Sequence, residues 1–512
     1  MQTWTEGYVT ELNYTHGYYR ELSPSLQRLA LLAAGYAPPP DNGAYLELGF
    51  GQGLSAVIHA AATPCPLWGT DFNPDHTGHA QSLAQAAGVA AQLLDDSFAE
   101  LVERQDLPSF QYIGLHGIWS WISDKNREHI VTLLRRHLAV GGVAYVSYNA
   151  LPGWSSGLAL RHLLTLHAET AGAESQGMAG RVEAALAFAE ELLEKGAAYF
   201  KANPLAVERL KRIRGQNRNY VAHEYFNGHW VPMAFSELAE WLSPAKLSFA
   251  ASAHLIDHVD LVNLTPEAQA MLAGISHPIL RQSIRDYFVN QSFRRDLFVR
   301  GARRLSPLEQ QEEWLATGFA LLTAAADVPL RIAGALGEVG LQETVYRPLI
   351  DAMARQGYRP RTFAQLREEL PQLSFGQLGQ ALLLLVGAGH AHPAQPEPVV
   401  KRVQARTAAL NLELCKRARS SGEINFLASP VIGAGVPVPR FHQLFLLARG
   451  KGQKTPEDWA QFVWSLLSAQ GHRLIKEGKT LDSAEDNIAE LTRQAVEFAD
   501  KRLPVLKGLG IA

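Results

Sequence analysis

The sequence has 512 residues, with 47 Lys or Arg, 50 Asp or Glu, two Cys and 47% apolar residues. This composition is typical of a folded chain that is long enough for several domains. No apolar run approaches the roughly 18 residues that a membrane helix needs, and no apolar block follows the start, so we expect a cytoplasmic protein with neither a membrane span nor a secretory signal. Cys65 and Cys415 have no neighbouring Cys/His cluster, which favours ordinary thiols over a disulfide or a metal site.

The charges are unevenly distributed along the chain. Residues 1–100 contain two basic and ten acidic residues, a net charge of −8, which leaves +5 for the other 412 residues. Phosphate contacts need Lys and Arg, so the acidic segment disfavours a nucleic-acid partner. It suits a cationic ligand or a lysine-bearing substrate instead.

Between residues 44 and 150, short apolar runs alternate with helical patterns, which predicts an α/β fold with a parallel sheet. The expected strands are Ala44–Leu48, Leu67–Asp71, Ala90–Leu94, Phe110–Leu115 and Gly142–Ser147. The expected helices span about 54–62, 75–87, 97–104 and 124–139. We therefore assign residues 1–160 to a Rossmann-like domain.

The rest of the chain is predicted to be mostly helical. We expect a helical segment at 161–215, a mixed aromatic-rich unit at 216–305, a winged-helix-like unit at 306–398 and a helical domain at 399–512. The winged-helix prediction rests on capping boxes at Thr362–Gln365 and Ser374–Gln377, followed by a strand-like tail at His390–Pro393. The would-be recognition helix, Ser374–Gly389, contains no Lys or Arg, which disfavours DNA binding.

The strongest local signal is a glycine loop between the first strand and the first helix. Glu47 precedes Gly49, Gly51 and Gly53, and these glycines allow a sharp turn and a close approach to a ligand. A dinucleotide fingerprint would place its third glycine at Leu54. The observed pattern, with its leading acid, is instead typical of sites for S-adenosyl-L-methionine (AdoMet), where the acid interacts with the amino group of the methionine moiety.

Two acidic positions on the next strands complete the predicted AdoMet site. Asp71, followed by Phe72, ends the second strand 24 residues after Glu47, where a carboxylate can accept both ribose hydroxyls. Asp96, Ser97 and Phe98 follow the third strand and would bind the adenine. Each element alone also fits a plain turn or a helix cap, but their order on consecutive strands favours the AdoMet site.

Aromatic and polar residues follow the fourth and fifth strands, where an open α/β sheet binds ligands. His116, Trp119 and Trp121 come after the fourth strand, and Asn149 and Trp154 come at or after the fifth. We predict His116, Trp119 and Asn149 as substrate-facing residues, together with Tyr18 from the segment before the sheet. Aromatic faces stabilise cations, although core packing is the alternative for each tryptophan and a structural hydrogen bond for His116.

These segments together carry a family resemblance. The sequences ELGFGQG, HGIWSWIS, SYNALPGW, HEYFNGHWVPMAF and RDYFVNQSFRRDLFVRG resemble bacterial class I AdoMet-dependent methyltransferases with a methyltransferase regulatory domain. The layout is similar to that of bacterial lysine methyltransferases that modify an outer-membrane protein. The resemblance implies a protein substrate and a homodimer formed through 161–215. It also implies a regulatory domain whose motif is matched by His223, Glu224, Tyr225, Trp230 and Phe235.

The sequence leaves three functions open. The first is methyl transfer from AdoMet to a protein lysine amine, which needs no dedicated base if the amine is desolvated beside the sulfonium. The second is transfer to a glycan or small molecule; a hydroxyl nucleophile needs a base, for which His116 is the candidate. The third is an AdoMet-binding regulator without catalysis.

Overall fold

A seven-stranded sheet organises the first 300 residues. The computed structural model of the chain describes residues 16–171 and 177–512, so the first fifteen residues of the predicted Rossmann-like domain and residues 172–176 of the helical segment lie outside the described residues. The strands are β1 (Tyr45–Leu48), β2 (Leu67–Thr70), β3 (Ala91–Leu94), β4 (Phe110–Leu115), β5 (Leu138–Asn149), β6 (Leu247–Ser252) and β7 (Phe293–Arg300). Their order is β3-β2-β1-β4-β5-β7-β6, and the α/β fold and its five predicted strands are confirmed.

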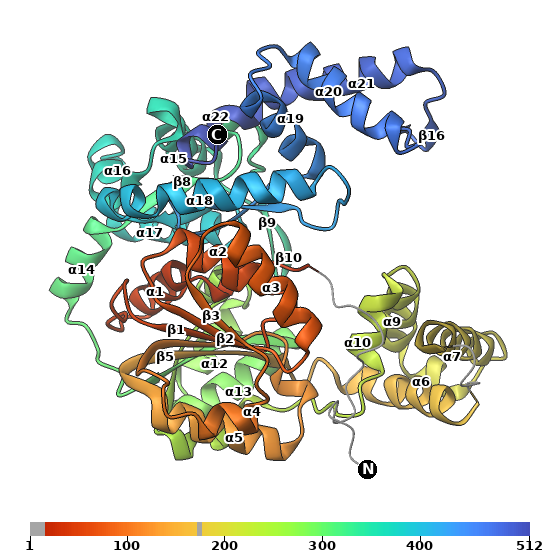
Figure 1. Cartoon of the computed structure of the whole chain (residues 1–512). Coiled ribbons are helices and arrows are strands. Elements are labelled where there is room, and N and C mark those ends of the chain that lie inside the picture. Colours follow the sequence, from red (N-terminus) through yellow and green to blue (C-terminus); the bar gives the residue numbers. More distant parts are fainter. Residues whose placement is uncertain (1–15, 172–176) are drawn as a thin grey trace.

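Helices cover both faces of this sheet (Figure 1). The helices are α1 (Pro24–Ala33), α2 (Leu54–Ala62), α3 (Pro74–Ala86), α4 (Phe98–Glu103), α5 (Asp124–His137) and α11 (Phe235–Leu242). Successive strand residues point to opposite faces: Tyr45 packs with α1, α2 and α3, whereas Leu46 packs with α4, α5 and α11. Both faces are therefore buried, as the apolar strands require.

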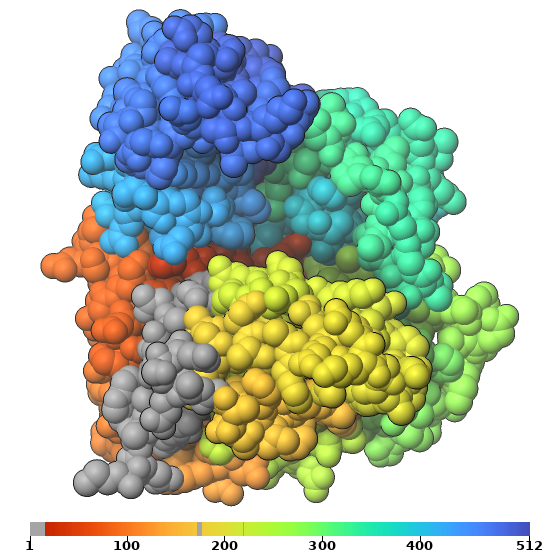
Figure 2. Space-filling view, turned by 90° about the vertical axis from the view of Figure 1, so that its right-hand side faces the viewer, coloured from red at the N-terminus to blue at the C-terminus, as the bar shows by residue number. Residues whose placement is uncertain are grey.

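A separate helical segment is inserted after β5. It consists of α6 (Leu158–Thr170), α7 (Gly177–Glu194), α8 (Ala198–Ala202), α9 (Pro204–Arg214) and α10 (Arg218–Tyr225). These helices bury a small core of their own around Leu164, Leu186 and Leu210. Figure 2 shows α6 and α7 in yellow on the face toward the viewer, below the blue C-terminal helices.

The stretch after this segment completes the main sheet. Strand β7 pairs antiparallel with β5, from Val143↔Val299 to Asn149↔Phe293, and β6 pairs antiparallel with β7. Between them lie α12 (Pro266–Ala273) and α13 (Pro278–Val289). The sheet therefore crosses the boundary expected at residue 216, and the division of the chain into five domains stays a prediction.

The last two hundred residues form smaller units above the sheet (Figure 1). The first contains α14 (Pro307–Ala316), β8 (Gly318–Leu321), the hairpin β9 (Arg331–Gly334) and β10 (Gly337–Gly340), α15 (Glu343–Tyr358), β11 (Arg361–Thr362), α16 (Phe363–Glu369), α17 (Phe375–Gly387) and β12 (Ala391–Ala394). The predicted capping boxes begin α16 and α17, and β11, β8 and β12 form one sheet. The winged-helix assignment itself stays a prediction.

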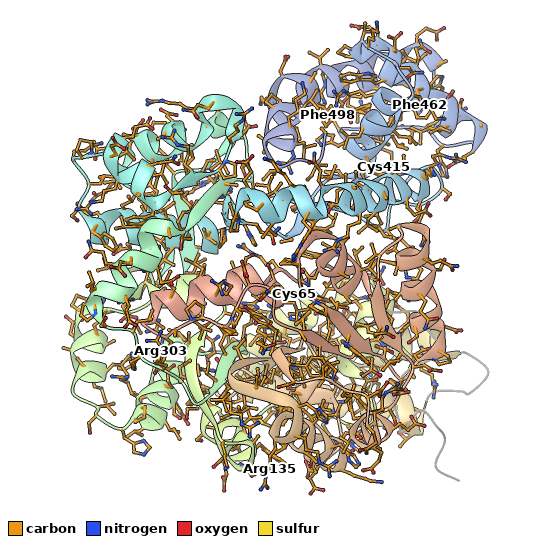
Figure 3. The ribbon with its side chains drawn as sticks, turned by 60° about the vertical axis from the view of Figure 1, so that its left-hand side comes forward. Cys65, Arg135, Arg303, Cys415, Phe462 and Phe498 are labelled. Atoms are coloured by element: carbon orange, nitrogen blue, oxygen red, sulfur yellow. The ribbon has the colours of Figure 1, made fainter. Side chains whose placement is uncertain are left out.

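The final unit packs onto α2 and α3 through its long first helix. This unit comprises α18 (Glu397–Arg417), β13 (Phe426–Ser429), β14 (Ala434–Pro437), α19 (Arg440–Gly450), α20 (Pro456–Ala469), β15 (Ile475–Lys476), β16 (Lys479–Thr480), α21 (Ala484–Glu497) and α22 (Leu503–Gly508). Arg406 and Thr407 of α18 donate hydrogen bonds of 2.8 and 3.0 Å to the Ala61 carbonyl at the end of α2. Cys415 on α18 and Cys65 beyond α2 are both free and buried (Figure 3).

No helix in the part of the chain that the structure describes combines the length and the apolar character needed to cross a membrane.

A buried ion cluster connects β7 to its neighbours. The Arg294 guanidinium binds Asp286 of α13 and donates at 2.8 Å to Asp296, which also accepts the Tyr148 hydroxyl of β5 at 3.0 Å. Arg294 lies 4.4 Å over the Phe235 ring. Because these groups are buried, removing the single cation would leave carboxylates without compensation.

We expect Arg294→Ala to lower the free energy of unfolding by about 3–5 kcal/mol, since breaking a buried pair strands the remaining charge. Arg303→Ala is the matched control, because Arg303 is exposed and its ion pair with Glu309 lies at the surface. Urea denaturation followed by tryptophan fluorescence measures both. Equal midpoints for the two variants would contradict a structural role for the cluster.

Candidate active site

A cavity of about 560 Å³ opens beyond the carboxyl ends of the parallel strands, where this class of sheet binds ligands. Of the residues predicted from the sequence, Glu47, Gly49, Gly51, Asp71, Phe72, Asp96, Ser97, Phe98, His116 and Asn149 line it. The structure therefore brings the predicted cofactor residues of three strands to one place.

Three positions of the loop between β1 and α2 have a backbone conformation that favours glycine. Gly49, Gly51 and Gly53 have φ angles of 66°, 56° and 75°, a region that other residues rarely adopt. A Cβ at Gly49 would lie 2.4 Å from Ile118 Cδ1, and one at Gly53 would lie 2.3 Å from Ala80 Cβ. Gly53 is the N-cap of α2 and does not line the cavity, so its role in the structure is to start the helix.

Glu47 lies beneath the loop, only 3% exposed. The Tyr45 hydroxyl donates to its Oε2 at 3.4 Å, which is a weak contact. Burial raises the pKa of Glu47 to about 8, so the carboxyl of the empty site is mostly protonated at pH 7. A ligand ammonium group would favour the carboxylate, as the predicted contact with the methionine amino group requires.

Asp71 ties the second strand to the glycine loop. Its Oδ2 accepts the Gly51 amide at 2.8 Å, and its Oδ1 accepts the Asn73 amide at 3.1 Å and lies 3.1 Å from His76 Nδ1. A carboxylate has about four acceptor sites, and Asp71 also lines the cavity. It can therefore hold the loop and still has one acceptor site for a ribose hydroxyl.

The residues after β3 combine a local role with a place in the cavity. Ser97 forms a capping box with Glu100 at the start of α4, and Asp96 pairs with Arg104 at 3.0 Å. The structure therefore confirms the helix cap that the sequence also allowed at Ser97. Both residues and Phe98 still line the cavity, which leaves the predicted adenine contacts as a prediction.

His116 lies in a stack of aromatic rings at the end of β4. Its Nδ1 is 2.8 Å from the Tyr145 hydroxyl, and the Tyr19 ring stacks on it with centroids 3.9 Å apart. Burial lowers the pKa of His116 to about 4. The imidazole is therefore neutral at pH 7 and is a weak base, which makes it a poor candidate for deprotonating a hydroxyl.

Two predicted substrate contacts are corrected by the structure. Trp119 is fully buried in the core, where its Nε1 contacts Met233 Sδ at 3.2 Å. Tyr18 is buried between His59, whose Nε2 lies 3.1 Å from its hydroxyl, and Phe426. Neither lines the cavity, whereas Trp121 and Tyr19 do.

The sequence did not predict the part of the cavity wall that the inserted helical segment supplies. The lining residues from this segment are Arg209, Arg212, Gln216, Tyr220, His223, Glu224, Tyr225 and Asn227. Arg209 lies 3.7 Å over the Trp154 ring, and Trp121 Nε1 reaches the Glu224 carbonyl at 3.5 Å. No spacing in the sequence places α9 or α10 beside a glycine loop more than 150 residues earlier.

The sheet order, the antiparallel β7 and the glycine loop at the cavity define a class I, Rossmann-like methyltransferase. Residues 217–300 match a family described as "Predicted methyltransferase regulatory domain". The chain is 42% identical over 516 residues, covering 100% of both chains, to the uncharacterized protein sll1526 of Synechocystis sp.. It is also 26% identical to the uncharacterized protein RP789 of Rickettsia prowazekii, over 53% of this chain and 48% of that protein.

Among solved structures, the chain is similar to PKMT2 from Rickettsia typhi in complex with AdoHcy (S-adenosylhomocysteine). The TM-score is 0.71 at 17% identity, over 97% of this chain and 100% of PKMT2. The likeness extends over the accessory units as well as the sheet. The chain belongs to the same family as the Synechocystis protein, and its residues 217–300 carry the match to the methyltransferase regulatory domain.

Changes in the loop and its partner should abolish cofactor binding. We expect Gly51→Val, which forces a branched residue to φ 56°, and Asp71→Ala to weaken AdoHcy binding at least tenfold, about 1.4 kcal/mol. Asp95 is exposed, so Asp95→Ala is the control and should bind AdoHcy with wild-type affinity. Isothermal titration calorimetry measures all three; unchanged affinity in both site variants would mean that the cofactor binds elsewhere.

Binding should also release a proton from Glu47. Its pKa of about 8 in the empty site means that ligand binding to the carboxylate becomes tighter as the pH rises from 6 to 8, by up to about tenfold per pH unit. Titrations with AdoHcy at pH 7 in buffers of different ionisation enthalpy count the protons released. Glu47→Gln should bind more weakly and release none; equal release by wild type and variant would contradict this role.

Proposed function

We propose that this enzyme transfers the methyl group of AdoMet to a lysine amine of a protein. The observation that carries the proposal is the aromatic wall of the cavity, to which the inserted segment and η2 (Trp119–Trp121) contribute Trp121, Trp154, Tyr220 and Tyr225. Aromatic faces attract a cation by about 0.5–2 kcal/mol each. The same cavity contains the glycine loop, so a cofactor and an amine can meet inside it.

The geometry suits a displacement at the sulfonium methyl. Such a reaction needs an amine lone pair aligned with the methyl–sulfur bond and a site from which water is excluded. A free lysine has a pKa of about 10.4, and an aromatic pocket beside a sulfonium lowers it. The neutral amine is the nucleophile.

The resemblance to bacterial protein lysine methyltransferases supports the same substrate. The full-length likeness to PKMT2 includes the accessory units, which give the chain far more surface than methyl transfer to a small molecule needs. A glycan or small-molecule acceptor and a non-catalytic regulator are the alternatives that the experiment separates.

We also propose that the inserted helices form a homodimer contact. Leu166, Phe188 and Leu205 expose 45%, 37% and 52% of their surfaces on this segment, and exposed apolar side chains at one segment support an interface. Light scattering on the purified protein should give twice the chain mass.

The substrate class can be tested directly. Purified protein incubated with a bacterial lysate and methyl-labelled AdoMet should place label in protein, and mass spectrometry should find methylated lysine peptides. Gly51→Val is the control and should transfer none. Label confined to glycan, lipid or small molecules would refute the lysine proposal; no label at all, with AdoHcy binding intact, would refute the enzyme.

A further inference from the structure

The acidic side chain of Glu224 lies in the aromatic part of the cavity. Glu224 is on α10, inside the segment that matches the regulatory-domain family, and lines the cavity together with Tyr220 and Tyr225 of the same helix. Trp121 contacts its carbonyl. The matched segment therefore supplies a wall of the reaction cavity itself.

The Glu224 carboxylate has no cationic partner of its own. Among the ion pairs of residues 16–171 and 177–512, none involves Glu224. The Asn149 amide at the end of β5 lies beside it, and Arg209 of α9 and Arg161 of α6 act on it from farther away. A half-buried carboxylate without an ion pair is unfavourable, unless a ligand brings the missing positive charge.

The arginines that could neutralise Glu224 are held elsewhere. Arg209 stacks over the Trp154 ring at 3.7 Å, and Arg161 lies 4.6 Å over the Trp230 ring and donates to the Asn227 carbonyl at 2.7 Å. These contacts fix both guanidinium groups against aromatic faces. Neither arginine forms an ion pair with Glu224 among the described residues, so a ligand cation can bind beside this carboxylate.

Resting on the proposed lysine methylation, we infer that Glu224 is a catalytic residue: its carboxylate binds the incoming lysine ammonium and accepts its proton before the methyl group is transferred. Asn149, predicted from the sequence as substrate-facing, is then a positioning residue, because it orients the carboxylate from the end of β5. The residue that accepts the proton therefore lies on α10 and not on the sheet.

The electrostatics of the wall agree with this geometry. Burial raises the pKa of Glu224 to about 7, while Asn149, Arg209 and Arg161 each act to lower it. Burial also raises the pKa of Tyr220 and Tyr225, so both phenols stay neutral. Near neutral pH the carboxylate is present and has a proton affinity suited to general-base work.

The step balances without any further reactant. One N–H bond of the lysine ammonium breaks and its proton moves to a Glu224 carboxylate oxygen. The freed lone pair forms a bond to the methyl carbon as the carbon–sulfur bond breaks, and that electron pair stays on sulfur. The products are neutral AdoHcy, a methylated ammonium and a protonated Glu224, which then loses its proton to water.

The test is Glu224→Gln in the full-length enzyme, with Glu240→Gln as control. Glu240 is an exposed residue of the same segment. We expect Glu224→Gln to keep wild-type AdoHcy affinity and to lose about 10²–10⁴-fold in kcat on a lysine substrate, the usual contribution of a general base. Glu240→Gln should retain full activity. Glu224→Asp, which keeps the carboxylate, should regain part of the rate.

The pH profile separates this role from a structural one. The wild-type kcat/KM should rise through about pH 7 and then level off, because a carboxylate and an ammonium are the reacting pair. In Glu224→Gln only the neutral lysine can react, so the residual rate should rise about tenfold per pH unit up to pH 9. A wild-type profile in Glu224→Gln, or full activity of that variant, would overturn the inference while leaving lysine methylation standing. Absence of lysine methylation by the wild type would instead refute the proposed function.

Discussion

The antiparallel pairing of β7 with β5 is the constraint on which the rest of the structure depends. It brings residues 293–299 beside β5, although the five parallel strands of the sheet all end before residue 150. The chain leaves the sheet at Asn149 and must return to it, so the inserted helices and α10 are anchored at both ends next to the carboxyl edge. The buried Arg294 cluster stabilises this return, because it connects β7, α13 and Tyr148 of β5.

The cavity has two parts because of this topology. The cofactor part comes from loops after β1, β2 and β3, which are close in sequence and held by hydrogen bonds such as that from Gly51 to Asp71. The aromatic part comes from helices inserted after β5. A segment that matches a regulatory-domain family thus contributes strands to the main sheet and residues to the cavity.

The sequence predicted the features that local interactions determine. The five parallel strands, the glycine loop and the boxes at Thr362 and Ser374 depend on residues within one turn or one strand. The sequence did not predict which of two nearby tryptophans faces the cavity. Trp119 lies in the core and Trp121 lines the cavity, because the two residues lie on different sides of one short helix. The approach of α10 to the glycine loop depends on the pairing of β7, which no local pattern encodes.

Two acidic residues of the cavity, Glu47 and Glu224, explain why we expect its ligands to be cations. Burial raises the pKa of both Glu47 and Glu224, to about 8 and about 7, while His116 stays neutral. Neutralised acids cost less to bury than carboxylates, and each becomes a carboxylate when a positive group arrives. In the proposed site, the ammonium group of AdoMet would meet Glu47 and its sulfonium would lie toward the aromatic wall. A second ammonium next to that sulfonium is unfavourable, so the lysine is bound most stably once its proton has moved to Glu224. Methyl transfer removes the sulfonium charge, so we expect AdoHcy to bind the cavity less tightly than AdoMet.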